Sequence, residues 1–253
     1  MSSRGKVGLF ASCSVDLFRP SVGFATANLL EFAGFEVDVP QQSCCGQANF
    51  NNADNLTAKQ LAWQIVETFE GYDYTVIPSG SCGGMIKYHY PELFADDHRL
   101  SRVQAFCDKV FELVSFLVAF NCPIPKADQA IQGLKVTYHD SCAGLREMGI
   151  QQQPRQLLNQ QHAVELIEVA DSNVCCGFGG TFCVKNGAVS EQMAHRKIAS
   201  MQASGAKTVL GGDVSCLLNL AGMASREGAD LRFYHVAEVL AGDLAYPALG
   251  GKE

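Results

Sequence analysis

The strongest constraint on this chain is that its sequence repeats itself around its cysteines. Three segments of the first half recur in the second half, in the same order and at a nearly constant offset. The matched pairs are residues 6–18 with 135–147, 35–50 with 165–182, and 74–85 with 206–219. Ordered matches of this kind predict two structurally similar halves. We place these cysteine-rich halves at residues 1–122 and 133–253.

Each half alternates segments typical of strands with segments typical of helices. Short apolar or alternating runs predict strands at residues 6–11, 35–40, 74–78, 135–139, 165–169 and 207–212. Longer runs with helix start and stop signals predict helices at 20–34, 53–70 and 188–203, and a buried helix at 110–120. Strands that alternate with helices imply a parallel sheet covered on both faces. We therefore expect an α/β fold of two duplicated Rossmann-like halves with mainly parallel sheets, related by a pseudo-two-fold axis.

Charge and apolar patterning exclude several classes of partner. The net charge is −7 and no basic run is present, which disfavours nucleic acid. The apolar stretch Val7 to Ala11 is shorter than a secretory signal requires, and Val110 to Phe120 is too short to cross a membrane. We expect a cytoplasmic protein with no membrane span.

The eleven cysteines are unusual for such a chain. An odd number of cysteines in a cytosolic setting favours metal or redox chemistry over a disulfide framework. Eight of them follow directly after predicted strands, four in each half. In a parallel sheet the loops beyond the carboxyl ends of the strands form the binding crevice, so each set of four should converge. The two sets are Cys13, Cys44, Cys45 and Cys82, and Cys142, Cys175, Cys176 and Cys216.

The spacing of these cysteines favours an iron–sulfur cluster over a single ion. No pair has the C-x₂-C spacing of zinc ribbons, and the adjacent pairs Cys44–Cys45 and Cys175–Cys176 dominate. Adjacent thiolates reach two irons of a cluster more readily than two corners of one tetrahedral ion, and Gly46 and Gly177 allow the backbone to turn tightly. Soft thiolates suit iron–sulfur clusters or zinc. We predict that both sets bind metal as one or two clusters of the [4Fe–4S] type.

The pattern resembles a known family. Two copies of C-x₃₀₋₃₂-C-C-G followed by a further Cys resemble the CCG cysteine-rich domain found in heterodisulfide reductase and in the glycolate oxidase iron–sulfur subunit. Segments such as GLFASCSVDLFRPSVG, SCCGQANFN, PSGSCGGM and NVCCGFGGTFCVK look closest to the lactate utilization protein A branch. In the wider superfamily a fifth Cys completes each motif, whereas this chain has Met85 and Asn219 there.

The resemblance implies an iron–sulfur oxidoreductase subunit that acts in the oxidation of L-lactate to pyruvate. It also implies two partner proteins, one of them a second iron–sulfur protein. Two other functions stay open: a cluster-dependent thiol–disulfide oxidoreductase of the heterodisulfide reductase type, and a metal-stabilised scaffold subunit. No residue is assigned as catalytic, although Arg19 and Arg146 occupy corresponding regions and could pair with a carboxylate.

Ordinary structural roles are expected for most of the remaining candidate residues. Cys107 and Cys122 have no counterpart in the repeat and are expected to pack in the core. Cys183 is either a core residue or a spare ligand or redox thiol. His139 is expected to be a hydrogen-bonded structural residue, with a role near the cluster as the alternative. The glycines after Cys176 do not match a dinucleotide-binding fingerprint.

Overall fold

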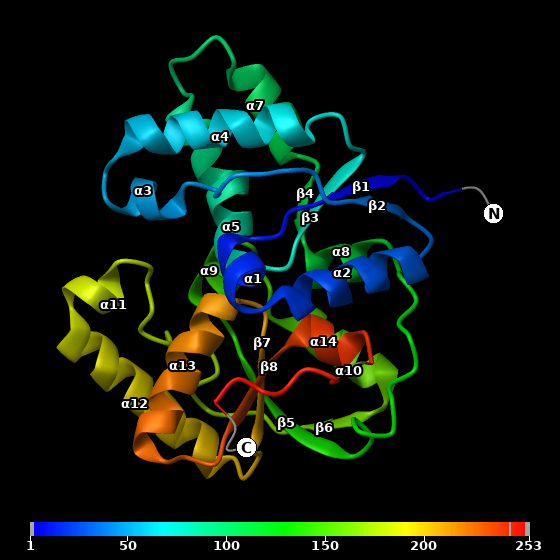
Figure 1. Ribbon diagram of the computed structural model, residues 1–253, viewed down its shortest axis with the longest axis vertical. Coiled ribbons are helices and arrows are strands. Elements are labelled where there is room, and N and C mark those ends of the chain that lie inside the picture. The colour runs from blue at the N-terminus through cyan, green and yellow to red at the C-terminus, as the bar shows by residue number, and fades with distance from the viewer. Residues whose placement is uncertain (1–2, 243, 251–253) are drawn as a thin grey trace.

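The protein folds into two similar halves, each built on a parallel sheet of four strands (Figure 1). The structure, a computed structural model, describes residues 3–242 and 244–250. The first sheet has the order β2-β1-β3-β4 and the second the order β6-β5-β7-β8. The strands are β1 (Lys6–Leu9), β2 (Glu36–Asp38), β3 (Tyr74–Ile77), β4 (Val110–Glu112), β5 (Leu134–His139), β6 (Val164–Leu166), β7 (Thr208–Gly211) and β8 (Arg232–His235). The predicted fold class is confirmed.

Matching ion pairs show that the two sheets are copies of one arrangement. Lys6 on β1 lies beside Glu36 on β2, and Lys135 on β5 lies beside Glu165 on β6. The side chains pair in both places, with Nζ–O distances of 3.9 and 3.7 Å. The same residues at the same ladder position confirm the alignment of the two repeats.

Helices connect the strands and cover the sheets. In the first half they are α1 (Cys13–Phe18), α2 (Pro20–Phe32), α3 (Gln47–Asn51), α4 (Asn55–Phe69), α5 (Gly80–Gly84), the π-helical turn η1 (Met85–His89), α6 (Tyr90–Leu93), α7 (Leu100–Cys107) and α8 (Leu113–Ala119). In the second half they are α9 (Cys142–Arg146), α10 (Gln152–Gln161), α11 (Phe182–Lys185), α12 (Gly187–Ala203), α13 (Val214–Glu227) and α14 (Val236–Leu240). Among the described residues no helix has the length and apolarity that crossing a membrane requires.

Two predicted helices begin later than expected. The expected helix at 110–120 is wrong for its first residues, which form the edge strand β4. A side-chain oxygen of Glu112 ends that strand because it accepts the backbone N–H of Val114 at 2.8 Å and so caps α8. The expected helix at 53–70 begins at Asn55, since Asp54 accepts the backbone N–H of Thr57 and caps α4.

The halves pack against each other through reciprocal helix pairs. Helix α1 contacts α13, and its counterpart α9 contacts α5. In the same way α2 contacts α14, and α10 contacts α8. Exchanging the halves converts each pair into the other, which is the relation that a two-fold axis produces. One hydrophobic core contains buried residues of both sheets, among them Val7 and Val136, so the division at 122 and 133 stays a prediction.

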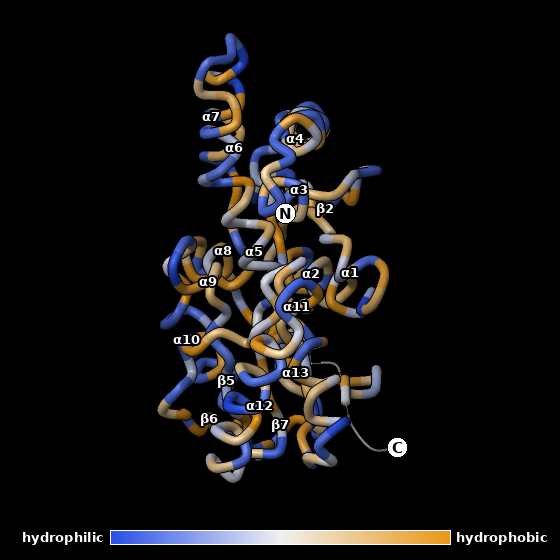
Figure 2. Tube along the Cα trace, turned by 90° about the vertical axis from the view of Figure 1, so that its left-hand side faces the viewer, coloured by the Kyte–Doolittle hydropathy of each residue, from blue (hydrophilic) through white to orange (hydrophobic). Residues whose placement is uncertain are grey.

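The first half carries an extra projection. Between β3 and β4 the chain forms α6 and α7, which extend at one end of the molecule (Figure 2). In the second half a single helix, α13, leads from β7 to β8. The insertion also reaches a cysteine loop, because the hydroxyl of Tyr90 on α6 donates to the carbonyl oxygen of Cys45 at 2.9 Å.

Candidate metal centres

The first four thiols come from three loops at the carboxyl ends of neighbouring strands. Cys13 begins α1 directly after its Ser12 cap, and Cys82 lies in the first turn of α5 after its Ser79 cap. Cys44 and Cys45 lie in the loop between β2 and α3. Because β1, β2 and β3 are adjacent and parallel, the loops meet at one edge of the sheet.

The structure brings these four side chains together. The Sγ atoms of Cys45 and Cys82 are 3.3 Å apart. The Cys44 thiol interacts with those of Cys13 and Cys45, and its sulfur accepts the backbone N–H of Gly46 at 3.4 Å. The thiols thus form an unbroken chain, which we call the first quartet: Cys13, Cys44, Cys45 and Cys82.

The second half repeats this arrangement. Cys142 begins α9 after its Ser141 cap, and Cys216 lies in the first turn of α13 after its Asp213 cap. Cys175 interacts with Cys142 and Cys176, and Cys176 with Cys216. The Cys175 sulfur accepts the backbone N–H of Gly177 at 3.4 Å. This second quartet consists of Cys142, Cys175, Cys176 and Cys216.

The thiols of each quartet strongly perturb one another. Interaction with Cys44, together with burial, raises the pKa of Cys13, and interaction with Cys175 has the same effect on the pKa of Cys142. In contrast, the thiols of Cys142 and Cys176 lower the pKa of Cys175. Thiols this close share protons as a group. A cation that binds all four would displace those protons.

The helices around each quartet favour negative charge. Cys13, Cys82, Cys142 and Cys216 all lie in the first turn of a helix. The free backbone N–H groups and the dipole at a helix N-terminus stabilise a thiolate. At Cys13 and Cys142 the backbone N–H at the helix start lowers the thiol pKa, but burial and the neighbouring thiols outweigh it and raise both pKa values.

The glycine after each cysteine pair has a conformation that other residues rarely adopt. Gly46 and Gly177 have φ values of +81° and +87°. A Cβ atom on Gly177 would lie 2.7 Å from the carbonyl oxygen of Ser190 on α12, and one on Gly46 would lie 3.3 Å from that of Ala58 on α4. Only glycine lets each cysteine loop lie directly against its helix.

Both quartets border open space. A pocket of about 370 Å³ lies between α1 and residues 39–43 and is lined by Cys13 and Cys44. A pocket of about 210 Å³ lies between the two halves and is lined by Cys142, Cys176 and Cys216. With soft sulfur donors that converge beside such a pocket, the residues present fit a thiolate-bound metal group.

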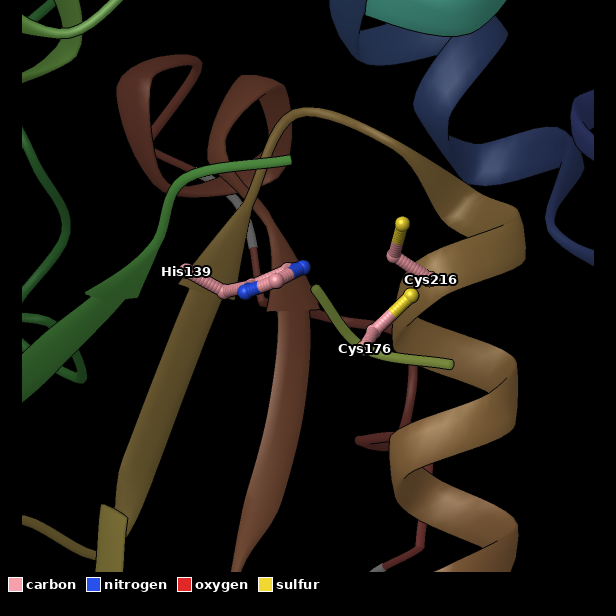
Figure 3. Close-up of side chains that lie close together, drawn as sticks. All are labelled: His139, Cys176 and Cys216. Atoms are coloured by element: carbon pink, nitrogen blue, oxygen red, sulfur yellow. The ribbon is translucent and has the colours of Figure 1, made fainter. Parts of the chain in front are cut away.

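The second quartet also has a histidine beside it. His139 ends β5, is 1% exposed, and has no partner for either ring nitrogen among the described residues. One of its nitrogens and the sulfurs of Cys176 and Cys216 all lie within 4.8 Å of one another (Figure 3). Burial, and then the charge of Lys197, lowers the pKa of His139 to about 3. The expectation of a hydrogen-bonded structural histidine is therefore wrong.

Side chains outside the quartets hold the cysteine loops. The Asn219 amide donates to the carbonyl oxygen of Cys176 at 2.9 Å, and the Tyr90 hydroxyl donates to that of Cys45 at the same distance. Met85, at the position that matches Asn219, is fully buried in the core of the first half. From the sequence alone, Met85 and Asn219 are recognisable only as the positions where the fifth cysteine of the superfamily is absent.

The remaining candidates lie elsewhere. Cys107 and Cys122 are buried in the core as expected. The Cys183 thiol is partly exposed and donates to the carbonyl oxygen of Gly180 at 3.2 Å. Arg19 is buried and paired with Glu238, so its guanidinium already binds a carboxylate of this chain.

These features define a duplicated α/β cysteine-rich protein with one thiol quartet at the sheet edge of each half. The model of the CCG family, described as a cysteine-rich domain, matches residues 7–87 and 136–221, one stretch in each half. Lactate utilization protein A of Geobacillus sp. (strain WCH70) is 41% identical over 237 residues, which cover 93% of this chain and 98% of that protein. The same-named protein of Bacillus subtilis (strain 168) is 39% identical with the same coverage. The chain belongs to the lactate utilization protein A family of CCG cysteine-rich proteins.

A solved structure supports the fold alone. A hypothetical protein from Helicobacter pylori matches with a TM-score of 0.66 at 11% identity. The match covers 100% of this chain, which spans about half of that protein, 53% of its length. The same overall fold therefore also occurs in a protein whose sequence has little similarity to this one.

Proposed function

We propose that this protein is the iron–sulfur electron-transfer subunit of a cytoplasmic complex that oxidises L-lactate to pyruvate. The observation that carries the proposal is the pair of thiol quartets at equivalent sheet edges. The relatives are named lactate utilization protein A, which indicates lactate as the substrate. Cysteine quartets are the usual ligands of [4Fe–4S] clusters, so each half has the donors for one.

The proposed ligands are Cys13, Cys44, Cys45 and Cys82 in the first half, and Cys142, Cys175, Cys176 and Cys216 in the second. A cluster bound by either quartet supplies one-electron redox chemistry. The chain itself positions the thiolates on rigid strand ends and helix starts, and encloses Cys45, Cys82, Cys176 and Cys216 away from water.

The surroundings of the first quartet suit contact with a partner protein. Cys13 is exposed, and the neighbouring α1 presents Leu17 and Phe18, which are 71% and 63% exposed. An exposed apolar rim beside a redox site is where another protein can approach closely. We propose two partner proteins of lactate utilization, one of which carries its own iron–sulfur centre.

Lactate itself is proposed to bind on a partner. Oxidation of lactate to pyruvate releases two electrons and two protons, and a substrate carboxylate is normally held by an arginine. The pocket beside the second quartet is lined by Asp213 and Glu147, and its described lining residues include no arginine or lysine. Acidic residues repel a carboxylate, so this chain is assigned electron transfer and not substrate binding.

The test is complementation of a strain that lacks this protein. The intact gene should restore L-lactate oxidation, Cys176→Ser should fail, and the matched core variant Cys107→Ser should succeed. A scaffold would tolerate Cys176→Ser as long as the complex assembles, which co-purification of the partners measures. If the purified chain alone oxidised lactate at full rate with an artificial acceptor, the subunit assignment would be contradicted. If it reduced a disulfide substrate without the partners, the thiol–disulfide alternative would be favoured.

A further inference from the structure

The two quartets have the same thiols but different neighbours. Because Lys6 and Lys135 occupy the same ladder position, Phe10 in the first half matches His139 in the second. Gly46 packs on Ala58 of α4 as Gly177 packs on Ser190 of α12. At equal distances further along these helices, Ile65 in the first half matches Lys197 in the second.

His139 faces the second quartet and has no other partner among the described residues. Its ring lies between the end of β5 and the sulfurs of Cys176 and Cys216 (Figure 3). A buried imidazole N–H without an acceptor is costly, and such groups in proteins are almost always satisfied. The sulfurs of Cys176 and Cys216 lie within 4.8 Å of a ring nitrogen, close enough to act as acceptors after a small adjustment. Phe10, its counterpart, packs against Phe69 in the core of the first half.

Lys197 brings a buried cation to the same site. The residue is 1% exposed. Its Nζ donates to the carbonyl oxygens of Asp171 and Ser172, the latter at 2.8 Å. These carbonyls belong to the loop that leads into Cys175. Burial lowers the pKa of Lys197 to about 8, and the nearby negative charges, those of Cys175 and Cys176 among them, favour its charged form. Ile65, its counterpart, is a fully buried apolar residue.

We propose that the two metal centres are unequal, and that His139 and Lys197 raise the reduction potential of the second one. His139 donates its N–H to a sulfur of that centre. Lys197 places a positive charge beside the loop that carries Cys175 and Cys176. Reduction adds negative charge, which a hydrogen bond to sulfur and a nearby cation both stabilise. The first centre has only Phe10 and Ile65 at these positions. This inference rests on the iron–sulfur centres of the proposed function.

The experiment isolates one centre at a time. A Cys45→Ser background disables the first quartet, and the second centre is then titrated by redox potentiometry with EPR detection. His139→Phe and Lys197→Met should each shift its midpoint potential downward with iron content unchanged. His139→Gln, which keeps an N–H donor, should retain most of the original potential. The matched control is Ile65→Met in a Cys176→Ser background, which should leave the potential of the first centre unshifted.

A second readout distinguishes a hydrogen bond from a metal bond. In protein labelled with ¹⁵N-histidine, pulsed EPR of the second centre should show a weak nitrogen coupling that disappears in His139→Phe. Potentials that do not move in His139→Phe and Lys197→Met would overturn the inference. So would a strong nitrogen coupling with loss of iron in His139→Phe, because His139 would then be a ligand. Absence of iron from the unmodified protein would instead refute the proposed function.

Discussion

Arg19 and Glu238 form a buried ion pair that joins the two halves of the molecule. The Arg19 Nε lies 2.9 Å from Oε1 of Glu238, and the two side chains are 8% and 3% exposed. The same Glu238 oxygen accepts the Ser21 hydroxyl at 2.7 Å, and its other oxygen accepts the backbone N–H of His235. Arg19 precedes α2 and Glu238 lies on α14. The pair therefore holds α2 against α14, which is one of the helix contacts between the two halves.

We predict that breaking this pair destabilises the protein strongly. Arg19→Met leaves a buried carboxylate without its cation, and Glu238→Gln leaves a buried guanidinium without its anion. Loss of one partner of a buried pair costs about 3–5 kcal/mol. The double variant should cost clearly less than the sum of the two single changes, as measured by urea unfolding. Additive effects would show that the two side chains do not depend on each other.

Gly177→Ala should destabilise the second cysteine loop and lower its metal content. The left-handed backbone costs a non-glycine residue roughly 1–2 kcal/mol, and the new Cβ would also collide with the Ser190 carbonyl. Gly222→Ala on α13 is the control, since nothing lies near its Cβ position and alanine favours a helix. Thermal unfolding and iron analysis measure both effects. Equal behaviour of the two variants would refute the close approach of this loop to α12.

Glu112 should make stability depend on pH. Burial raises the pKa of this carboxyl to about 8 from its ordinary 4.5. Because the folded-state pKa is raised, its contribution to stability is complete below pH 4.5 and is lost as the pH rises through 8. The slope from one such group is at most about 1.4 kcal/mol per pH unit.

The matched variant for this prediction is Glu112→Gln, which does not titrate and keeps an oxygen that can cap α8. Urea unfolding at a series of pH values should show the unmodified protein losing stability relative to the variant between pH 4.5 and 8. Parallel curves would mean that Glu112 is already ionised in the folded protein below pH 8.

Much of the fold was predictable because the duplication and the strand ends are both visible in the sequence. Two strands were missed for a physical reason. Strand β4 is only Val110–Glu112 and runs directly into α8, so its apolar residues merge with the helical pattern. Strand β8, Arg232–His235, likewise runs straight into α14. Both are edge strands whose pairing depends on the neighbouring strand and not on local pattern.

The convergence of the cysteines was predictable for the same reason, since parallel strands place their ends together. The orientation of His139 was not, because a histidine at a strand end has several possible partners. Only the structure shows that its ring faces Cys176 and Cys216. Comparison of the repeats offered one clue: the residue that matches His139 is Phe10, so the two positions do not share one structural role.

The most informative measurement is the iron and sulfide content, with an EPR spectrum, of protein purified without oxygen. The unmodified chain should bind iron and sulfide in equal amounts, at about four irons per quartet. Cys45→Ser and Cys176→Ser should each remove the iron of one quartet and leave the other, while Cys107→Ser should bind as much as the unmodified chain. Iron content that is unchanged in Cys45→Ser and Cys176→Ser, or protein that binds zinc without sulfide, would contradict the assignment of two iron–sulfur centres.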